Sequence, residues 1–136
     1  MVKTVIDTYA WIEFFSGTEK GLKVKDILEN SEEIYTPGVV LAEIARKFFS
    51  EGKENVFINS RLELITAASN ITGIDAELAI EAAKCYLELM ENARKSKLNT
   101  PSLFDAIILA TCRSLESKVV TGDEHFKNLP ETIWIK

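Results

Sequence analysis

Histidine and cysteine are scarce in this 136-residue chain, which contains one histidine, His125, and two cysteines, Cys85 and Cys112. A zinc site built from histidine and cysteine needs several such ligands, and a Ser-His-Asp triad would depend on His125 alone. The cysteines form no C-x-x-C pair. Two isolated thiols within predicted amphipathic helices are typical of a reducing compartment, so we expect a cytoplasmic protein.

Long apolar runs, a basic leader and flexible linkers are also missing from the sequence. No apolar run approaches the roughly 18–20 residues of a membrane span, and the first residues show no signal-peptide pattern. With 3 prolines, 6 glycines and no internal repeat, the chain shows no linker-like boundary. We therefore expect no membrane association and a single domain covering residues 1–136.

Positive charge is the minority, with 16 Lys and Arg against 21 Asp and Glu and a net charge of −5. This balance excludes a uniformly basic domain that holds nucleic acid through its net charge. Hydrophobic residues make up 46% and charged residues 27%, which is ordinary for a globular protein. A chain of this length buries enough surface to fold without disulfides or a structural metal.

Short apolar segments alternate along the chain with longer segments of helical periodicity, which predicts an α/β fold. Because the strands are brief apolar runs, we expect helices on both faces of a mostly parallel sheet of about five short strands. The expected strands are residues 2–6, 34–35, 71–74, 118–121 and 132–135. The first expected helix contains Trp11 and ends at Gly17, and further helices are expected over residues 22–28, 39–49 and 57–68. Another helix follows an N-cap at Asp75, and the last runs from a Thr100-Pro101 cap to about Glu116.

Four acidic residues stand out because each lies in or directly beside an apolar segment: Asp7, Glu43, Asp105 and Asp123. Acidic side chains are rarely buried without a partner. In a parallel sheet, the carboxyl ends of strands and the first turns of the following helices share one edge. The predicted elements send all four residues to that edge.

A cluster of carboxylates raises the pKa values of its own members unless a cation lies among them. Magnesium prefers oxygen ligands, and a bound divalent cation can activate water and stabilise the leaving oxygen of a phosphodiester. The four residues therefore predict metal-dependent hydrolysis of a phosphoryl bond.

Each acidic residue also has a simpler interpretation. Asp7 could cap the helix that follows it, and Asp105 could complete a capping box with Ser102. Glu43 could pair with Lys47 four residues later, and Asp123 could begin a turn with Gly122.

At these positions the chain resembles the PIN-domain ribonucleases, and more narrowly the VapC-type toxins of toxin–antitoxin pairs. The resemblance covers nearly the whole chain. It rests on four segments in order: Val5-Ile6-Asp7-Thr8, Thr36-Pro37 leading to Leu41-Ala42-Glu43-Ile44, Ser102-Leu103-Phe104-Asp105-Ala106, and Val119-Val120-Thr121-Gly122-Asp123-Glu124-His125-Phe126.

The resemblance implies a three-layer α/β/α fold, a Mg²⁺ or Mn²⁺ site, endonucleolytic cleavage of RNA, a homodimer, and a small antitoxin protein that blocks the site. It implies that Asp7, Glu43 and Asp105 are the principal metal ligands and that Asp123 is the fourth. Thr8 and Thr121 would support them through hydrogen bonds.

The resemblance places His125 in a structural turn rather than in the chemistry. Many relatives carry Arg or Lys where this chain has Gly122, so a possible phosphate contact is missing there. Arg46, one turn after Glu43, is the better candidate for a phosphate contact than the polar segment Arg94-Lys95-Ser96-Lys97.

Other interpretations stay open at this point. Trp11, Phe14 and Phe15 could serve the core or an antitoxin groove. The chain could be a housekeeping RNA-processing nuclease, or a non-catalytic PIN-like module that binds nucleic acid or a partner. A dehalogenase-like phosphatase is disfavoured because Tyr9 stands where its second Asp is needed.

Overall fold

The computed structural model describes residues 3–136, so Val2, in the first predicted strand, lies outside the described residues. Five parallel strands form one sheet in the order β3-β2-β1-β4-β5. The strands are β1 (Lys3–Ile6), β2 (Glu33–Pro37), β3 (Asn70–Thr72), β4 (Lys118–Thr121) and β5 (Thr132–Trp134). The predicted parallel α/β fold is confirmed, and β1 lies at the centre of the sheet.

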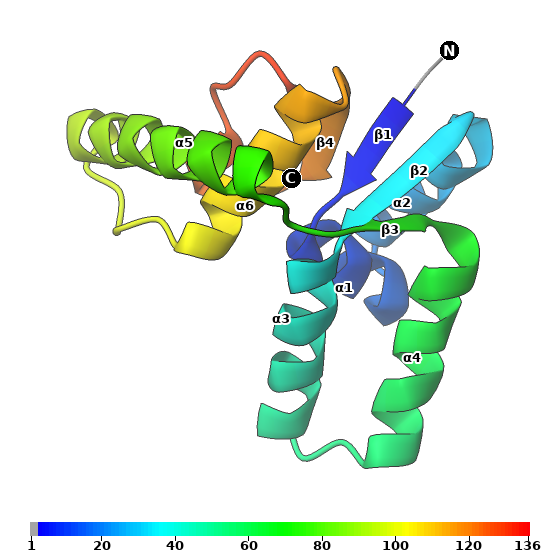
Figure 1. The fold of residues 1–136 in the computed structure, drawn as a ribbon. Coiled ribbons are helices and arrows are strands. Elements are labelled where there is room, and N and C mark those ends of the chain that lie inside the picture. Colours follow the sequence, from blue (N-terminus) through cyan, green and yellow to red (C-terminus); the bar gives the residue numbers. More distant parts are fainter. Residues whose placement is uncertain (1–2) are drawn as a thin grey trace.

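Six α-helices connect the strands: α1 (Thr8–Ser16), α2 (Glu19–Asn30), α3 (Gly38–Ser50), α4 (Asn55–Ala68), α5 (Ala76–Ser96) and α6 (Leu103–Ser114). A 3-10 turn, η1 (Glu124–Phe126), follows β4. Figure 1 shows α5 and α6 on one side of the sheet, α1 and α2 on the other, and the α3–α4 hairpin extending beyond the strand ends. This is the expected three-layer arrangement.

The helix that contains Asp105, α6, begins later than predicted. Thr100 and Pro101 do not cap it; Ser102 is the N-cap, because its hydroxyl accepts the Asp105 N–H at 3.1 Å while the Asp105 carboxylate accepts the Ser102 N–H at 2.9 Å. The polar segment from Arg94 to Lys97 was expected to lie in the connection before this helix, and that prediction was wrong. The segment is the end of α5 and its C-cap, where Lys97 adopts a φ of +57°.

Strand bounds differ by one or two residues from the prediction. β2 continues through Thr36 and Pro37, which were expected to end it, and β3 covers Asn70–Thr72 rather than 71–74. Proline is tolerated at the end of β2 because the strand stops there and α3 begins at the next residue.

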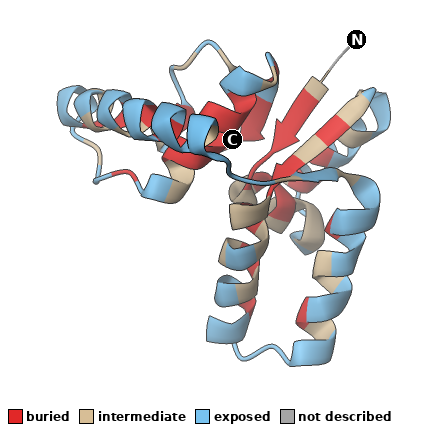
Figure 2. Ribbon diagram, viewed as in Figure 1, coloured by how far each residue is buried: buried red, intermediate tan, exposed pale blue. Residues whose placement is uncertain are grey.

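The core covers both faces of the sheet, and it includes α6 as well as buried residues of α1, α2, α3 and α4. Val5, Ile6, Val119 and Val120 have no exposed surface, and α6 buries every residue from 106 to 112. Figure 2 shows this buried centre, with exposed residues along α5 and the α3–α4 hairpin. Cys85 and Cys112 are free and buried. Within residues 3–136, we find no helix with both the length and the apolarity that a membrane span requires.

Candidate active site at the carboxyl edge of the sheet

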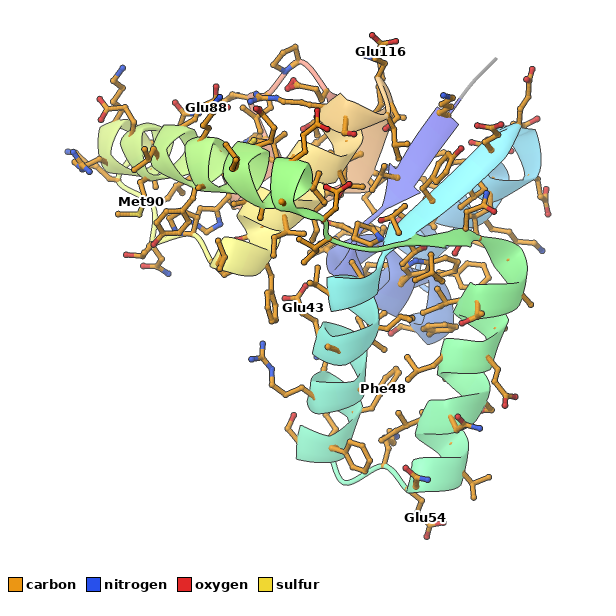
Figure 3. All side chains as sticks on the ribbon, in the orientation of Figure 1. Glu43, Phe48, Glu54, Glu88, Met90 and Glu116 are labelled. Atoms are coloured by element: carbon orange, nitrogen blue, oxygen red, sulfur yellow. The ribbon has the colours of Figure 1, made fainter. Side chains whose placement is uncertain are left out.

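The four predicted acidic residues lie together. Asp7 follows β1 directly, Asp123 follows the neighbouring strand β4 after one residue, Glu43 lies in the second turn of α3, and Asp105 lies in the first turn of α6. All four line one open pocket of about 390 Å³. In Figure 3 the Glu43 side chain extends from the side of α3 that faces the start of α6. The structure therefore brings side chains from four distant segments to one pocket.

Asp7 and Asp105 each cap a helix and also line the pocket. Asp7 Oδ1 accepts the Ala10 N–H at 2.9 Å, and Asp105 Oδ2 accepts the Ser102 N–H at 2.9 Å. The simpler interpretation of each residue as a helix cap is thus correct, but it does not exclude the site. Helix N-termini lie at the same edge as strand ends, so a capping acid is already directed there.

Glu43 does not form the predicted pair with Lys47. Lys47 binds Glu51 at 2.9 Å, whereas Glu43 Oε1 accepts the hydroxyl of Thr8 at 2.7 Å. The Glu43 side chain is therefore directed toward the start of α1. The resemblance implied a supporting hydrogen bond from Thr8, and its role in a functional site stays a prediction.

Asp123 caps the short turn η1 through its carboxylate, which accepts the His125 N–H at 2.9 Å. Its own N–H donates to the hydroxyl of Thr121 at 2.9 Å. Thr121 is fully buried, and its hydroxyl also hydrogen-bonds Asp7. Thr121 thus contacts the carboxylate of Asp7 and the backbone N–H of Asp123, and its supporting role stays a prediction.

The electrostatics of the pocket disfavour four free carboxylates. Burial, reinforced by the charges of Asp123 and Asp105, raises the pKa of Asp7 to about 7, although hydrogen bonds from Thr121 and Ala10 oppose this. Burial also raises the pKa values of Glu43 and Asp105 above their usual range. Buried like charges are unfavourable without a cation, so the pocket as folded favours binding one.

A hard divalent cation fits these residues. The donors are carboxylate oxygens from four residues, the ligand type that Mg²⁺ and Mn²⁺ prefer. One oxygen of each carboxylate is held by a neighbouring donor, which orients the side chain and leaves its second oxygen for a ligand. Ligand atoms of Asp105, Asp123 and His125 lie within 4.8 Å of one another.

His125 is held through both ring nitrogens. Nδ1 contacts Asp123 Oδ1 at 2.9 Å, and Nε2 contacts the carbonyl oxygen of Asn99 at 2.7 Å. Because a carbonyl oxygen only accepts, Nε2 carries a proton. Burial lowers the pKa of His125, but its hydrogen bonds to Asn99 and Asp123 outweigh burial and the pKa lies above its usual range. The ring therefore braces the segment before α6 against Asp123.

Of the predicted cations, Arg46 lies near the pocket, whereas Arg94 and Lys95 do not line it. Arg46 is exposed, and its charge lowers the pKa of Glu43, so it is close enough to act on this carboxylate. Arg94 and Lys95 lie at the end of α5, where both pair with Glu91. Lys47 lines the pocket although it pairs with Glu51.

Sequence reasoning missed several residues of the pocket wall: Tyr9, Ile12, Glu13 and Ile108. A weak signal was available, since Tyr9 and Glu13 are four residues apart on α1, as helix neighbours are. Of the aromatic residues that could have served the core or an antitoxin groove, Trp11 belongs to the core. It is fully buried, and its Nε1–H donates to the Thr36 hydroxyl at 3.1 Å. Phe14 and Phe15 are half-buried against it.

Comparison with solved structures supports the fold. A toxin–antitoxin complex from Klebsiella pneumoniae matches with 21% identity and a TM-score of 0.68, covering 98% of each chain. DNA-bound VapBC from Salmonella typhimurium matches with 21% identity and a TM-score of 0.69, covering 100% of this chain and 98% of that one. Mycobacterium tuberculosis VapC20, described as a toxin that cleaves the sarcin-ricin loop, matches with 15% identity and a TM-score of 0.71, covering 94% and 95%.

At these identities the likeness is one of fold, and it confirms the structural similarity to VapC-type proteins. No curated protein matches the sequence. The decisive finding comes from the sequence itself, because the family model described as PIN domain matches residues 4–131, which include β2, β3, β4, all but the first residue of β1, and all six α-helices, and stop just before β5. The chain, with its parallel sheet and acidic pocket, therefore belongs to the PIN-domain family.

Proposed function

We propose that this protein is a divalent-metal-dependent endoribonuclease and the toxin of a VapBC-type pair. One observation carries the proposal: Asp7, Glu43, Asp105 and Asp123 come from four separate elements and line one pocket, in which burial raises the pKa values of Asp7, Glu43 and Asp105. Membership of the PIN-domain family and structural similarity to VapC20 and VapBC proteins support it.

In this proposal, Asp7, Glu43 and Asp105 hold Mg²⁺ or Mn²⁺ directly, and Asp123 assists at one side. A cation bound there would supply Lewis-acid polarisation of a phosphodiester and a water of lowered pKa. Thr8 keeps Glu43 directed into the pocket, and Thr121 holds Asp7 and Asp123 at their present separation. Arg46, exposed beside Glu43, contacts a phosphate of the RNA.

A small antitoxin and a second copy of the chain are the proposed protein partners. The similar structures from Klebsiella pneumoniae and Salmonella typhimurium are toxin–antitoxin assemblies. Here the α3–α4 hairpin leaves Phe49 54% and Val56 79% exposed, and the first residue of α6, Leu103, is 55% exposed. Apolar side chains at two separate places favour two separate contacts.

The proposal is tested by inducing the protein and mapping cleavage sites in total RNA, with Asp105→Asn as the matched control. Asn keeps an oxygen that can accept the Ser102 N–H, so the capping box and the fold should survive. We expect discrete cuts for the wild type, none for Asp105→Asn, and none for purified wild type in EDTA.

Two results would contradict the proposal. Full cleavage by Asp105→Asn would remove the acidic pocket from the chemistry. Metal binding without cleavage of any RNA would instead favour a non-catalytic binding module. A neighbouring reading frame that encodes a small DNA-binding protein, together with co-purification of that protein with this chain, would favour a toxin over a housekeeping nuclease.

A further inference from the structure

Tyr9 lies on Gly122, at the wall of the acidic pocket. A Cβ atom added at Gly122 would lie 2.6 Å from the Tyr9 Cζ and 2.9 Å from its Cδ1, and closer still to Cε1. The ring therefore packs directly on the backbone between Thr121 and Asp123, in a space that any other residue would fill. Gly122 is buried, and Tyr9 is half-buried.

The hydroxyl of Tyr9 is fixed by a cation from another helix. Lys20, in the first turn of α2, donates from Nζ to the Tyr9 hydroxyl at 3.2 Å, and the same nitrogen lies 5.8 Å from the ring centroid. The ring thus packs along one edge, from Cδ1 to Cζ, on Gly122, and its hydroxyl contacts Lys20. A positive charge stands beside the aromatic ring at the edge of a strongly acidic site.

Tyr9 also lines the same pocket of about 390 Å³ as the four carboxylates. An immobilised aromatic ring beside a site for phosphodiester chemistry suits the π-face of an unpaired nucleobase, because stacking needs a flat partner and no particular base. Bases within a duplex are already stacked and cannot reach such a ring. The ammonium of Lys20 suits the adjacent backbone phosphate.

We propose that Tyr9 stacks on a nucleobase of single-stranded RNA next to the cleaved phosphodiester, and that Lys20 contacts the neighbouring phosphate. This inference rests on the proposed function and names the form of the substrate. It also assigns a purpose to Gly122, because the lack of a side chain there makes room for the ring.

The test measures binding of a short fluorescent single-stranded RNA, with the Asp105→Asn chain used throughout so that no RNA is cut. Adding Tyr9→Leu keeps the apolar volume but removes the ring, and we expect binding to weaken about 5- to 100-fold. Tyr9→Phe retains the ring and should recover most of the affinity. Gly122→Ala should resemble Tyr9→Leu because its Cβ displaces the ring.

A structural role for Tyr9 would not produce the following pattern. Replacing single nucleotides of the RNA in turn by abasic ones should weaken binding at one position, and Tyr9→Leu should cause no further loss with that RNA. Lys20→Gln should reduce the magnitude of the slope of log affinity against log salt concentration by about one, which corresponds to the loss of one phosphate contact. Thermal melting of each variant verifies that it is folded.

The outcomes separate this inference from the proposed function. If the wild type cuts RNA but Tyr9→Leu binds single strands as tightly as Tyr9→Phe, the stacking role is wrong while the nuclease stands. Equal loss with every abasic RNA, or tighter binding of a duplex of the same sequence, would also overturn it. If the wild type neither binds nor cuts any RNA, both proposals fail.

Discussion

The carboxylates of the pocket are held by neighbours that belong to the helix starts. Glu43 is the one whose partner is a side-chain hydroxyl from another helix, since Thr8 donates to its Oε1 at 2.7 Å. That hydrogen bond lowers the pKa of Glu43 against the opposing effect of burial. Thr8 therefore favours the ionised form of Glu43 and directs its carboxylate into the pocket.

Replacing Thr8 by valine removes this donor with little change in volume. We expect the pKa of Glu43 to rise further and the affinity for Mn²⁺ to fall about 10- to 100-fold, the usual effect of losing a partner of a metal ligand. Calorimetric titration with Mn²⁺ measures the change. Thr8→Ser keeps the hydroxyl and is the matched control. Equal Mn²⁺ affinity in Thr8→Val and wild type would show that the hydroxyl has no part in the site.

The sequence predicted the four acidic residues, because each is a charged residue in an apolar setting at a strand end or helix start. It also predicted Ser102 as the capping partner of Asp105, but from the residues alone it offered Lys47 as the partner of Glu43. Glu43 has both Lys47 and Thr8 within reach, and the choice of Thr8 depends on how α1 and α3 pack. Tyr9 was missed for a similar reason: its place in the pocket depends on contact with Gly122, which is distant in sequence.

At the scale of elements, α1 and α2 pack unusually closely. A Cβ atom added at Gly21 would lie 2.9 Å from the carbonyl carbon of Glu13, closer still to its oxygen, and 3.2 Å from the Cα of Phe14. These are backbone atoms, which cannot swing away as a side chain can. The lack of a side chain at Gly21 thus sets the angle between the two helices and the position of Lys20 beside Tyr9.

We expect Gly21→Ala to lower the free energy of unfolding by about 1–3 kcal/mol, because the overpacking exceeds the gain of roughly 1 kcal/mol from alanine's better helix propensity. Urea unfolding measures the change. Gly73→Ala is the matched control, since nothing lies within 4 Å of its added Cβ, and it should change stability by less than about 0.5 kcal/mol. If both variants are equally stable, α2 shifts freely and the close packing has no energetic role.

Most elements were predictable because hydrophobic periodicity and caps are local. Gly17 ends α1 with a φ of +66°, and Asp75 caps α5 through the Leu78 N–H, both as predicted. The start of α6 was not, since Thr100 and Ser102 are both good caps by residue type. Ser102 is selected by its reciprocal hydrogen bonds with Asp105, a residue that is itself held by the pocket.

At the scale of the whole molecule, part of the net charge of −5 is concentrated in one place. The four carboxylates share a pocket of about 390 Å³, while cations of α5 are paired with Glu91 at a distance from it. An acidic chain can therefore still act on RNA, because a bound cation would meet the phosphate where the protein's net charge would repel it. The same concentration of charge makes the stability of the fold depend on pH.

The sign of this dependence follows from the raised pKa values. Asp7 has a pKa of about 7 in the folded protein against 3.8 when unfolded, so its contribution to stability is fully present below about pH 4 and is lost as the pH rises through 7. Glu43 and Asp105 act in the same direction. At pH 8 the ionised Asp7 costs up to about 4 kcal/mol.

We therefore expect Asp7→Asn to be more stable than wild type at pH 8 without metal, with the difference shrinking toward pH 4. Asn retains an oxygen that can accept the Ala10 N–H, so the helix cap is kept. Excess Mg²⁺ at pH 8 should reverse the order, because ligand binding stabilises only the chain that retains the full site. Thermal melting of both chains across pH, with Mg²⁺ and with EDTA, measures this. If the stability difference is independent of both pH and Mg²⁺, Asp7 acts only as a helix cap. A reversal on adding Mg²⁺ would instead show that cation binding offsets the unfavourable burial of the Asp7 charge.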